Sequence, residues 1–116
     1  MNRILLISRQ APYHSHLARG ALDAALAAAV FEQDISLLFM DDGIWQLIAQ
    51  QRTEAAFTKS VEKTLRSLEL YDVEQLYFEQ ASAAVRGIGS QEFCVRCEPV
   101  TDVASFIDTF DVVWSF

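Results

Sequence analysis

The chain has 116 residues, which is enough for one domain built around one hydrophobic core. Hydrophobic residues make up 52% of the sequence, and in so small a domain this share indicates that some apolar surface meets a partner. The formal net charge is -7, with 9 Lys and Arg residues scattered among 16 acids, which argues against direct binding of nucleic acid.

No stretch is typical of a secreted or membrane protein. The apolar patch near the N-terminus is short and has no small-residue cleavage site after it, so it does not predict a signal peptide. No run approaches the roughly 18 apolar residues of a membrane span. We therefore expect a soluble, cytoplasmic protein that does not bind a membrane.

The first predicted elements are a strand and a long helix. Ile4–Ile7 predicts a strand, and Ser15 can cap a helix over His16–Phe31. This helix is apolar almost all round, although a helix that covers one face of a sheet usually keeps a polar stripe. Its outer side is therefore expected to lie under either a neighbouring helix of the same chain or a partner.

The next stretch, Ile35–Leu47 (ISLLFMDDGIWQL), is the one around which we expect the fold to be organised. Residues 35–40 predict a strand buried on both faces of a parallel sheet. Asp41-Asp42-Gly43 ends that strand, and Ile44–Ile48 predicts a short helical turn. In open α/β sheets ligands gather at the ends of central strands, so this rim is where a site is expected.

Further segments complete an alternating order of strands and helices. They are an amphipathic helix at Phe57–Leu68, a strand at Val73–Phe78, a short helix at Ala81–Val85, a strand from Phe93 to Pro99, a helix through Val103, Phe106 and Ile107 capped by Asp102, and a strand at Asp111–Trp114. Helices that cross between strands predict a three-layer α/β fold with a mostly parallel five-stranded sheet. We expect one domain over residues 1–116.

Asp41 and Asp42 are the first candidates for chemistry. Paired acids at a strand end can bind Mg²⁺, but such sites also need a carboxylate at another strand end and usually a Lys on the last strand. The last predicted strand of this chain has no Lys. A turn and helix cap explains the two acids more simply.

Cys94 and Cys97 form a C-x-x-C motif. A redox motif of this kind needs its first cysteine at a helix N-terminus, whereas these two fall within a predicted strand, where residues three apart point to opposite faces. A zinc site would need two further ligands, and nothing in the spacing joins His14 or His16 to the cysteines. We therefore expect ordinary strand cysteines and no metal.

The first loop carries no recognisable catalytic or cofactor motif. His14, Ser15 and His16 lack the G-x-S-x-G turn that would present a serine nucleophile, and neither G-x-G-x-x-G nor a P-loop follows the first strand. No cofactor is expected. Among the large aromatics, Tyr13, Phe31 and Trp45 could anchor an interface or fill the core, whereas Trp114 is expected to fill the core.

Four segments together resemble the DsrE/DsrF-like family and, within it, the TusC/DsrF branch. They are APYHS (11–15), ISLLFMDDGIWQL (35–47), LRSLELYDVEQLYFEQASAAVRGI (65–88) and FDVVWSF (110–116). The most specific pieces are F-x-D-D-G-x-x-Q-L at Phe39–Leu47, L-x-L-Y-D-V-E at Leu68–Glu74 and the aromatic end after the last strand.

The resemblance implies a flavodoxin-like fold and a role in sulfur relay. Members of this branch assemble with TusB-like and TusD-like subunits as a heterohexamer with two copies of each chain. The complex receives persulfide sulfur from a TusA-like carrier and passes it through a cysteine of the TusD-like subunit to a TusE-like protein. The sulfur reaches the 2-thio group of the wobble uridine in tRNA or, in Dsr-type organisms, serves sulfur oxidation.

The resemblance also places the sulfur-carrying cysteine of the active subunit just after the third strand. This chain has Phe78–Ser82 there, without a cysteine. We therefore expect a non-catalytic structural subunit with no catalytic, cofactor or metal residues, and the alternative is sulfur acceptance by Cys94 or Cys97. The residues expected to contact partners are Tyr13, Leu22, Leu26, Ile44 and Trp45.

Overall fold

The fold is built on a five-stranded sheet. The computed structural model describes residues 3–10, 17–30, 34–48, 65–71, 73 and 75–116. The strands are β1 (Arg3–Ser8), β2 (Asp34–Phe39), β3 (Gln75–Glu79), β4 (Glu98–Val100) and β5 (Val112–Ser115). Their order is β4-β3-β2-β1-β5, and every neighbouring pair is parallel, which confirms the predicted α/β class with a flavodoxin-like sheet.

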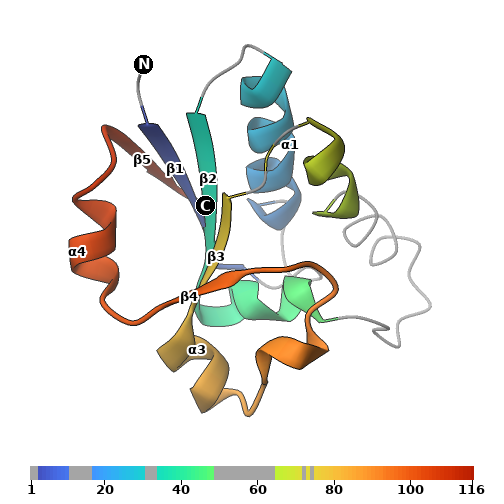
Figure 1. Ribbon diagram of the computed structural model, residues 1–116, viewed down its shortest axis with the longest axis vertical. Helices are drawn as coiled ribbons and strands as arrows, with labels where there is room; N and C mark the ends of the chain where they lie inside the picture. Colours follow the sequence, from blue (N-terminus) through green and yellow to red (C-terminus); the bar gives the residue numbers. More distant parts are fainter. Residues whose placement is uncertain (1–2, 11–16, 31–33, 49–64, 72, 74) are drawn as a thin grey trace.

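Helices lie on both faces of this sheet. They are α1 (Leu17–Val30), α3 (Gln80–Val85) and α4 (Val103–Ile107), with 3-10 helices η1 (Asp41–Leu47), η2 (Leu68–Tyr71) and η3 (Ser90–Glu92). Figure 1 shows α1 and residues 65–71 on one face, α4 on the other, and α3 with η1 at the carboxyl ends of the strands. Most of the predicted helix Phe57–Leu68 lies outside the described residues; residues 65–67 are helical.

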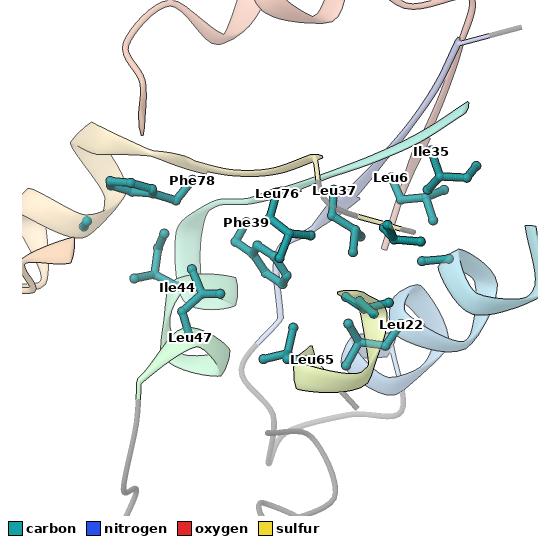
Figure 2. Packing of buried hydrophobic residues seen from close by; sticks show 14 residues of the cluster. Leu6, Leu22, Ile35, Leu37, Phe39, Ile44, Leu47, Leu65, Leu76 and Phe78 are labelled. Atoms are coloured by element: carbon teal, nitrogen blue, oxygen red, sulfur yellow. The ribbon is translucent and has the colours of Figure 1, made fainter. Parts of the chain in front are cut away.

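The core has two parts because β2 is buried on both of its faces. On the α1 face, Leu6 and Phe39 pack with Leu22 of α1 (Figure 2). On the α4 face, Leu5 and Leu38 pack in a second, smaller cluster. The central strands therefore read as continuous apolar runs, as expected for a parallel sheet covered on both sides.

The outer side of α1 is partly covered by the chain itself. Leu22 and Ala25 are fully buried and share a cluster with Leu65 and Leu68, which belong to the helical turn beside α1 (Figure 1). Ala27, in contrast, is exposed. A neighbouring helical segment thus accounts for much of the apolar pattern, and a smaller face remains open.

Polar contacts fasten the two ends of the chain together. The backbone N–H of Arg3 donates to Asp111 Oδ2 at 2.7 Å, and Arg3 Nη1 donates to the carbonyl oxygen of Thr109 at 2.9 Å. The Arg3 guanidinium also lies 4.6 Å from the centre of the Phe110 ring. These contacts join the start of β1 to the turn that leads into β5.

Candidate functional site

The candidate site is the rim where the carboxyl ends of β1, β2 and β3 meet, because parallel strands place all of these ends at one edge. Two close contacts with the carbonyl oxygen of Ser8 shape it. The N–H of Met40 donates to the carbonyl oxygen of Ser8 at 3.1 Å, and a Cβ added to Gly43 would overlap that same oxygen. Only glycine fits at Gly43, so the D-D-G turn is required by the close approach of two strand ends.

Gln46 also holds this turn against the end of β1. It is 1% exposed, and its Nε2 donates to Ser8 Oγ at 2.6 Å and to the carbonyl oxygen of Gln10 at 2.9 Å. Among the residues that the structure describes, its Oε1 has no hydrogen-bond partner. The glutamine of the D-D-G-x-x-Q-L motif therefore connects η1 to the end of β1.

Asp41 and Asp42 each face an arginine from another part of the chain. Arg9 Nε lies 3.0 Å from Asp41 Oδ2, and Arg86 Nη2 lies 2.8 Å from Asp42 Oδ1. A guanidinium beside each carboxylate disfavours a second cation at the same oxygen atoms. The pair closes the strand as expected, but Met40 rather than an aspartate stands at the cap position of η1, so the predicted capping role is wrong.

Backbone geometry at Asp41 depends on a serine from α3. Asp41 has φ 51°, a left-handed conformation that Asp adopts more readily than most residues. Its N–H donates to Ser82 Oγ at 2.9 Å. Ser82 in turn donates to Glu79 Oε1, so its hydroxyl is engaged on both sides.

Ser82 lies in the segment where the family resemblance expects a cysteine. It is 5% exposed, and Arg86 Nη1 donates to its carbonyl oxygen at 3.1 Å. A hydroxyl cannot hold a persulfide, which forms on a thiolate. The strand-end cluster, which we define as Arg9, Asp41, Asp42, Glu79, Ser82 and Arg86, is thus a network of paired polar groups from four elements of the chain.

The cysteines do not lie in a strand, and this prediction is wrong. Residues 93–97 form a loop, and β4 begins only at Glu98. Phe93 makes an isolated antiparallel bridge with Ile48, and the N–H of Cys94 donates to the carbonyl oxygen of Leu47 at 2.6 Å. The Phe93 ring packs edge-on against Phe78, with ring centres 4.8 Å apart. An isolated bridge, one backbone hydrogen bond and aromatic packing therefore hold this segment, rather than continuous strand pairing.

The loop places the two thiols in different settings. Burial, together with smaller contributions from the neighbouring Cys94 and Glu98, raises the pKa of the Cys97 thiol to about 12. Cys97 is therefore protonated at neutral pH and a poor nucleophile. The expectation that the two thiols point to opposite faces rested on a strand, and residues 93–97 form a loop instead.

Cys94 borders a cavity of about 640 Å³ on the α1 face of β3. Among the described residues, its walls are Leu65, Arg66, Val73, Leu76, Cys94, Val95, Arg96 and Glu98. Sequence reasoning missed this cavity because its walls come from three separate segments.

The predicted partner residues fall into three groups. Leu22 and Ile44 are fully buried in the chain's own core and offer no surface, which corrects their selection (Figure 2). Leu26 is partly buried, Trp45 is 37% exposed, and Tyr13 lies outside the described residues. His14, Ser15, His16 and Phe31 also lie outside them.

Within the described part of the chain, the surface carries three large apolar side chains whose exposure sequence reasoning missed. They are Leu70, Val85 and Trp114. Trp114 is 52% exposed, so the expectation that it fills the core is wrong. The only available signal was the position of Trp114 in the last strand, because a strand at the end of the chain order can lie at the edge of a sheet.

Comparison with known proteins defines the class and then the family. The chain has the parallel, flavodoxin-like α/β fold of the E. coli ychN protein, whose crystal structure it matches with a TM-score of 0.82 at 22% sequence identity over 100% of both chains. The model of the DsrE/DsrF-like family matches residues 2–113. The chain therefore belongs to the DsrE/DsrF-like family.

Relatives within the family narrow the similarity further. The chain is 35% identical to the "Protein TusC homolog" of Pseudomonas aeruginosa over 101 residues, which is 87% of this chain and 85% of that one. It is 33% identical to the "Protein TusC homolog" of Vibrio vulnificus strain CMCP6 over 86% of this chain and 85% of that one. In the part of the chain that the structure describes, no helix is both long and apolar enough to span a bilayer.

Proposed function

We propose that the chain is a non-catalytic structural subunit of a sulfur-relay heterohexamer. Its partners would be TusB-like and TusD-like subunits, and the assembly would take persulfide sulfur from a TusA-like carrier and pass it to a TusE-like protein. The similarity to TusC homologues over most of the chain supports the assignment to this pathway.

The observation that carries the non-catalytic role is the setting of Ser82. This residue occupies the segment after β3 where the relay needs a thiol, and its buried hydroxyl bonds both Asp41 and Glu79. Persulfide transfer requires a thiolate to attack the sulfane sulfur of the donor. A hydroxyl engaged in this way supports packing of the strand ends and offers no sulfur-carrying atom.

Co-expression with TusB-like and TusD-like chains tests the assembly. We expect one stable complex that contains all three chains in equal amounts, with a mass measured by light scattering that fits two copies of each. If this chain elutes alone while the other two remain together, the proposal fails.

A second candidate function is sulfur acceptance by Cys94, because this thiol borders the 640 Å³ cavity. Persulfide trapping and mass spectrometry on the assembled complex would separate the two. The structural role predicts unchanged sulfur transfer in Cys94→Ala, with Cys97→Ala as the matched control. Loss of transfer in Cys94→Ala alone would support the second candidate.

The destination of the sulfur is proposed to be 2-thiouridine at the wobble position of tRNA, with the sulfur-oxidation complex as the alternative. The chain's net charge of -7 suits a subunit that leaves tRNA binding to a downstream enzyme. Deletion of the gene should lower the 2-thiouridine content of total tRNA. Unchanged 2-thiouridine together with impaired oxidation of reduced sulfur would favour the alternative.

A further inference from the structure

The cavity on the α1 face of β3 has an inner wall that is built from the core. Leu65, Val73 and Leu76 line it, and all three are buried members of the main hydrophobic cluster. The cavity volume of about 640 Å³ lies within the range of about 300–1,000 Å³ that is typical of small-molecule sites. The inner wall therefore offers a preformed apolar surface to the body of a small ligand.

The outer wall of the cavity comes from the loop before β4. Cys94, Val95 and Arg96 belong to this loop, and Glu98 begins β4. The loop is attached to the rest of the chain at Cys94, whose N–H donates to the carbonyl oxygen of Leu47 at 2.6 Å. Both walls are thus formed by contacts within the chain.

The charged side chains of the lining are more positive than negative. Among the described residues that line the cavity, Arg66 and Arg96 stand against one carboxylate, Glu98. This balance is unusual for the chain, whose 16 acids outnumber its 9 Lys and Arg residues. The local excess of positive charge favours an anionic ligand over a cationic one.

Both guanidinium groups keep hydrogen-bond donors for a ligand. Arg96 Nε lies 3.9 Å from Glu98 Oε1, which is a loose contact, and the Arg96 side chain is largely exposed. Arg66 is exposed and already has an interaction within the chain. A guanidinium has five N–H donors, so one partner leaves others for a carboxylate, which an arginine can bind through two parallel hydrogen bonds.

We propose that this cavity binds a small organic acid, with its apolar body against the inner wall and its anionic group at Arg66 and Arg96. The apolar wall and the two cations belong to one cavity, so a single ligand that has both properties satisfies them together. Glu98 disfavours a ligand with several negative charges, because its carboxylate lines the same space. This binding is independent of sulfur transfer, and its test uses the full chain alone.

Phenylbutyrate is a suitable probe because it joins a phenyl ring to one carboxylate through a short apolar chain. Isothermal titration calorimetry should show one binding site for it. Phenylbutanol, which has the same body without the charge, should bind at least about 5-fold more weakly, and phenylbutylamine should not bind measurably. Absence of saturable binding of the acid, or equal affinity of the acid and the alcohol, would overturn the proposal.

Substitutions in the lining locate the site. Arg66→Gln and Arg96→Gln should each weaken binding of phenylbutyrate about 5-fold, whereas Arg9→Gln, which removes an equal charge from the strand-end cluster, should leave it unchanged. Val95→Trp fills the cavity from its loop side and should abolish binding, with Val85→Trp at an exposed position of α3 as the matched control. Unchanged affinity in both arginine variants, or in Val95→Trp, would refute the proposed site.

Cys94 gives an independent readout on the unmodified chain, because it borders the cavity. Phenylbutyrate should slow the alkylation of Cys94 by iodoacetamide in proportion to occupancy, as followed by mass spectrometry of the peptide. Cys97 is not among the described residues that line the cavity, so its alkylation is the internal control. A Cys94 rate that saturating phenylbutyrate leaves unchanged would contradict binding in this cavity. No persulfide takes part in the measurement, so its failure would leave the sulfur-relay role standing.

Discussion

The strand-end cluster and the cysteine loop (residues 93–97) are built differently, although three members of the cluster, Glu79, Ser82 and Arg86, lie in the same stretch of chain as the loop. The strand-end cluster joins four elements through paired polar groups, with Ser82 bonded to both Asp41 and Glu79. The cysteine loop is held by one isolated bridge at Phe93 and an aromatic contact, and it borders a cavity. The acidic turn at Asp41-Asp42-Gly43, which suggested a metal site, lies in the region with many polar contacts. The C-x-x-C motif, which carries the thiols, lies in the region with few contacts.

This difference shows that a residue type alone does not define a site. The two aspartates are neutralised by arginines and serve the architecture of the rim. The Cys97 thiol has reactive chemistry in principle, but burial holds its pKa at about 12 and keeps it protonated. Four perturbations test how strongly the strand-end cluster supports stability and how unreactive the thiol of the cysteine loop is.

The largest effect is expected for Gly43→Ala. The added Cβ would overlap the carbonyl oxygen of Ser8, so two strand ends would have to separate, and we expect a loss of about 3 kcal/mol in the free energy of unfolding. Urea denaturation followed by circular dichroism measures it. Gly20→Ala is the matched control, because a Cβ there meets only ordinary contacts in a helix, and it should be neutral or stabilising.

Ser82→Ala should have the next largest effect. It leaves the part-buried N–H of Asp41 without its acceptor, and loss of a hydrogen-bond partner costs about 1–3 kcal/mol, with the lower end expected for partial burial. Thermal and chemical unfolding would report it, with Ser90→Ala at an exposed position as the control. Equal stability of the two variants would show that the strand-end cluster does not depend on this hydroxyl.

The thiol of Cys97 should make stability fall at high pH. Its pKa rises from 9.0 to about 12 on folding, so the stability it contributes is complete below pH 9 and is lost as the pH rises from 9 to 12. Each pH unit in this window should remove about 1 kcal/mol, and less where water reaches the thiol.

The comparison that isolates this effect is between the unmodified chain and Cys97→Ala. The difference in their free energies of unfolding should change with pH only above 9. Cys94→Ala should keep most of the dependence, because burial is the main cause of the shift. A flat difference between pH 9 and 11 would contradict the assigned burial of Cys97.

Arg9→Ala should have the smallest effect. The pair with Asp41 is about half exposed on both sides, and surface ion pairs contribute about 0–1 kcal/mol. The loss should shrink further at high salt, which screens exposed charges. A salt-independent loss of several kcal/mol would mean that Arg9 supports the rim by packing rather than by charge.

The sheet could be predicted because its central strands have local sequence patterns that are typical of strands. β2 is a continuous apolar run that ends at Asp41-Asp42-Gly43, and Asp102 caps α4 as expected, with Oδ1 accepting from the N–H of Ser105 at 3.2 Å. Periodicity and capping act over a few residues, so they can be read from the sequence.

The strand-end cluster and the cysteine loop could not be predicted in the same way. Arg9 and Arg86 lie 32 and 44 residues from the aspartates they pair with, and no local pattern joins them. Phe93-Cys94-Val95 has the composition of a strand, but its backbone follows tertiary contacts with Leu47 and Phe78. The pKa of Cys97 likewise depends on burial, which results from tertiary packing and cannot be read from the local sequence.

The hydrogen bond between Arg3 and Asp111 has a consequence for how the chain folds. It joins groups 108 residues apart, so β1 pairs with β5 only when almost the whole chain has been brought together. Closing so long a loop costs entropy before the contacts reward it, and such contacts slow folding. We therefore expect β5 to dock late, and the β1–β5 seam to open first when the native chain fluctuates.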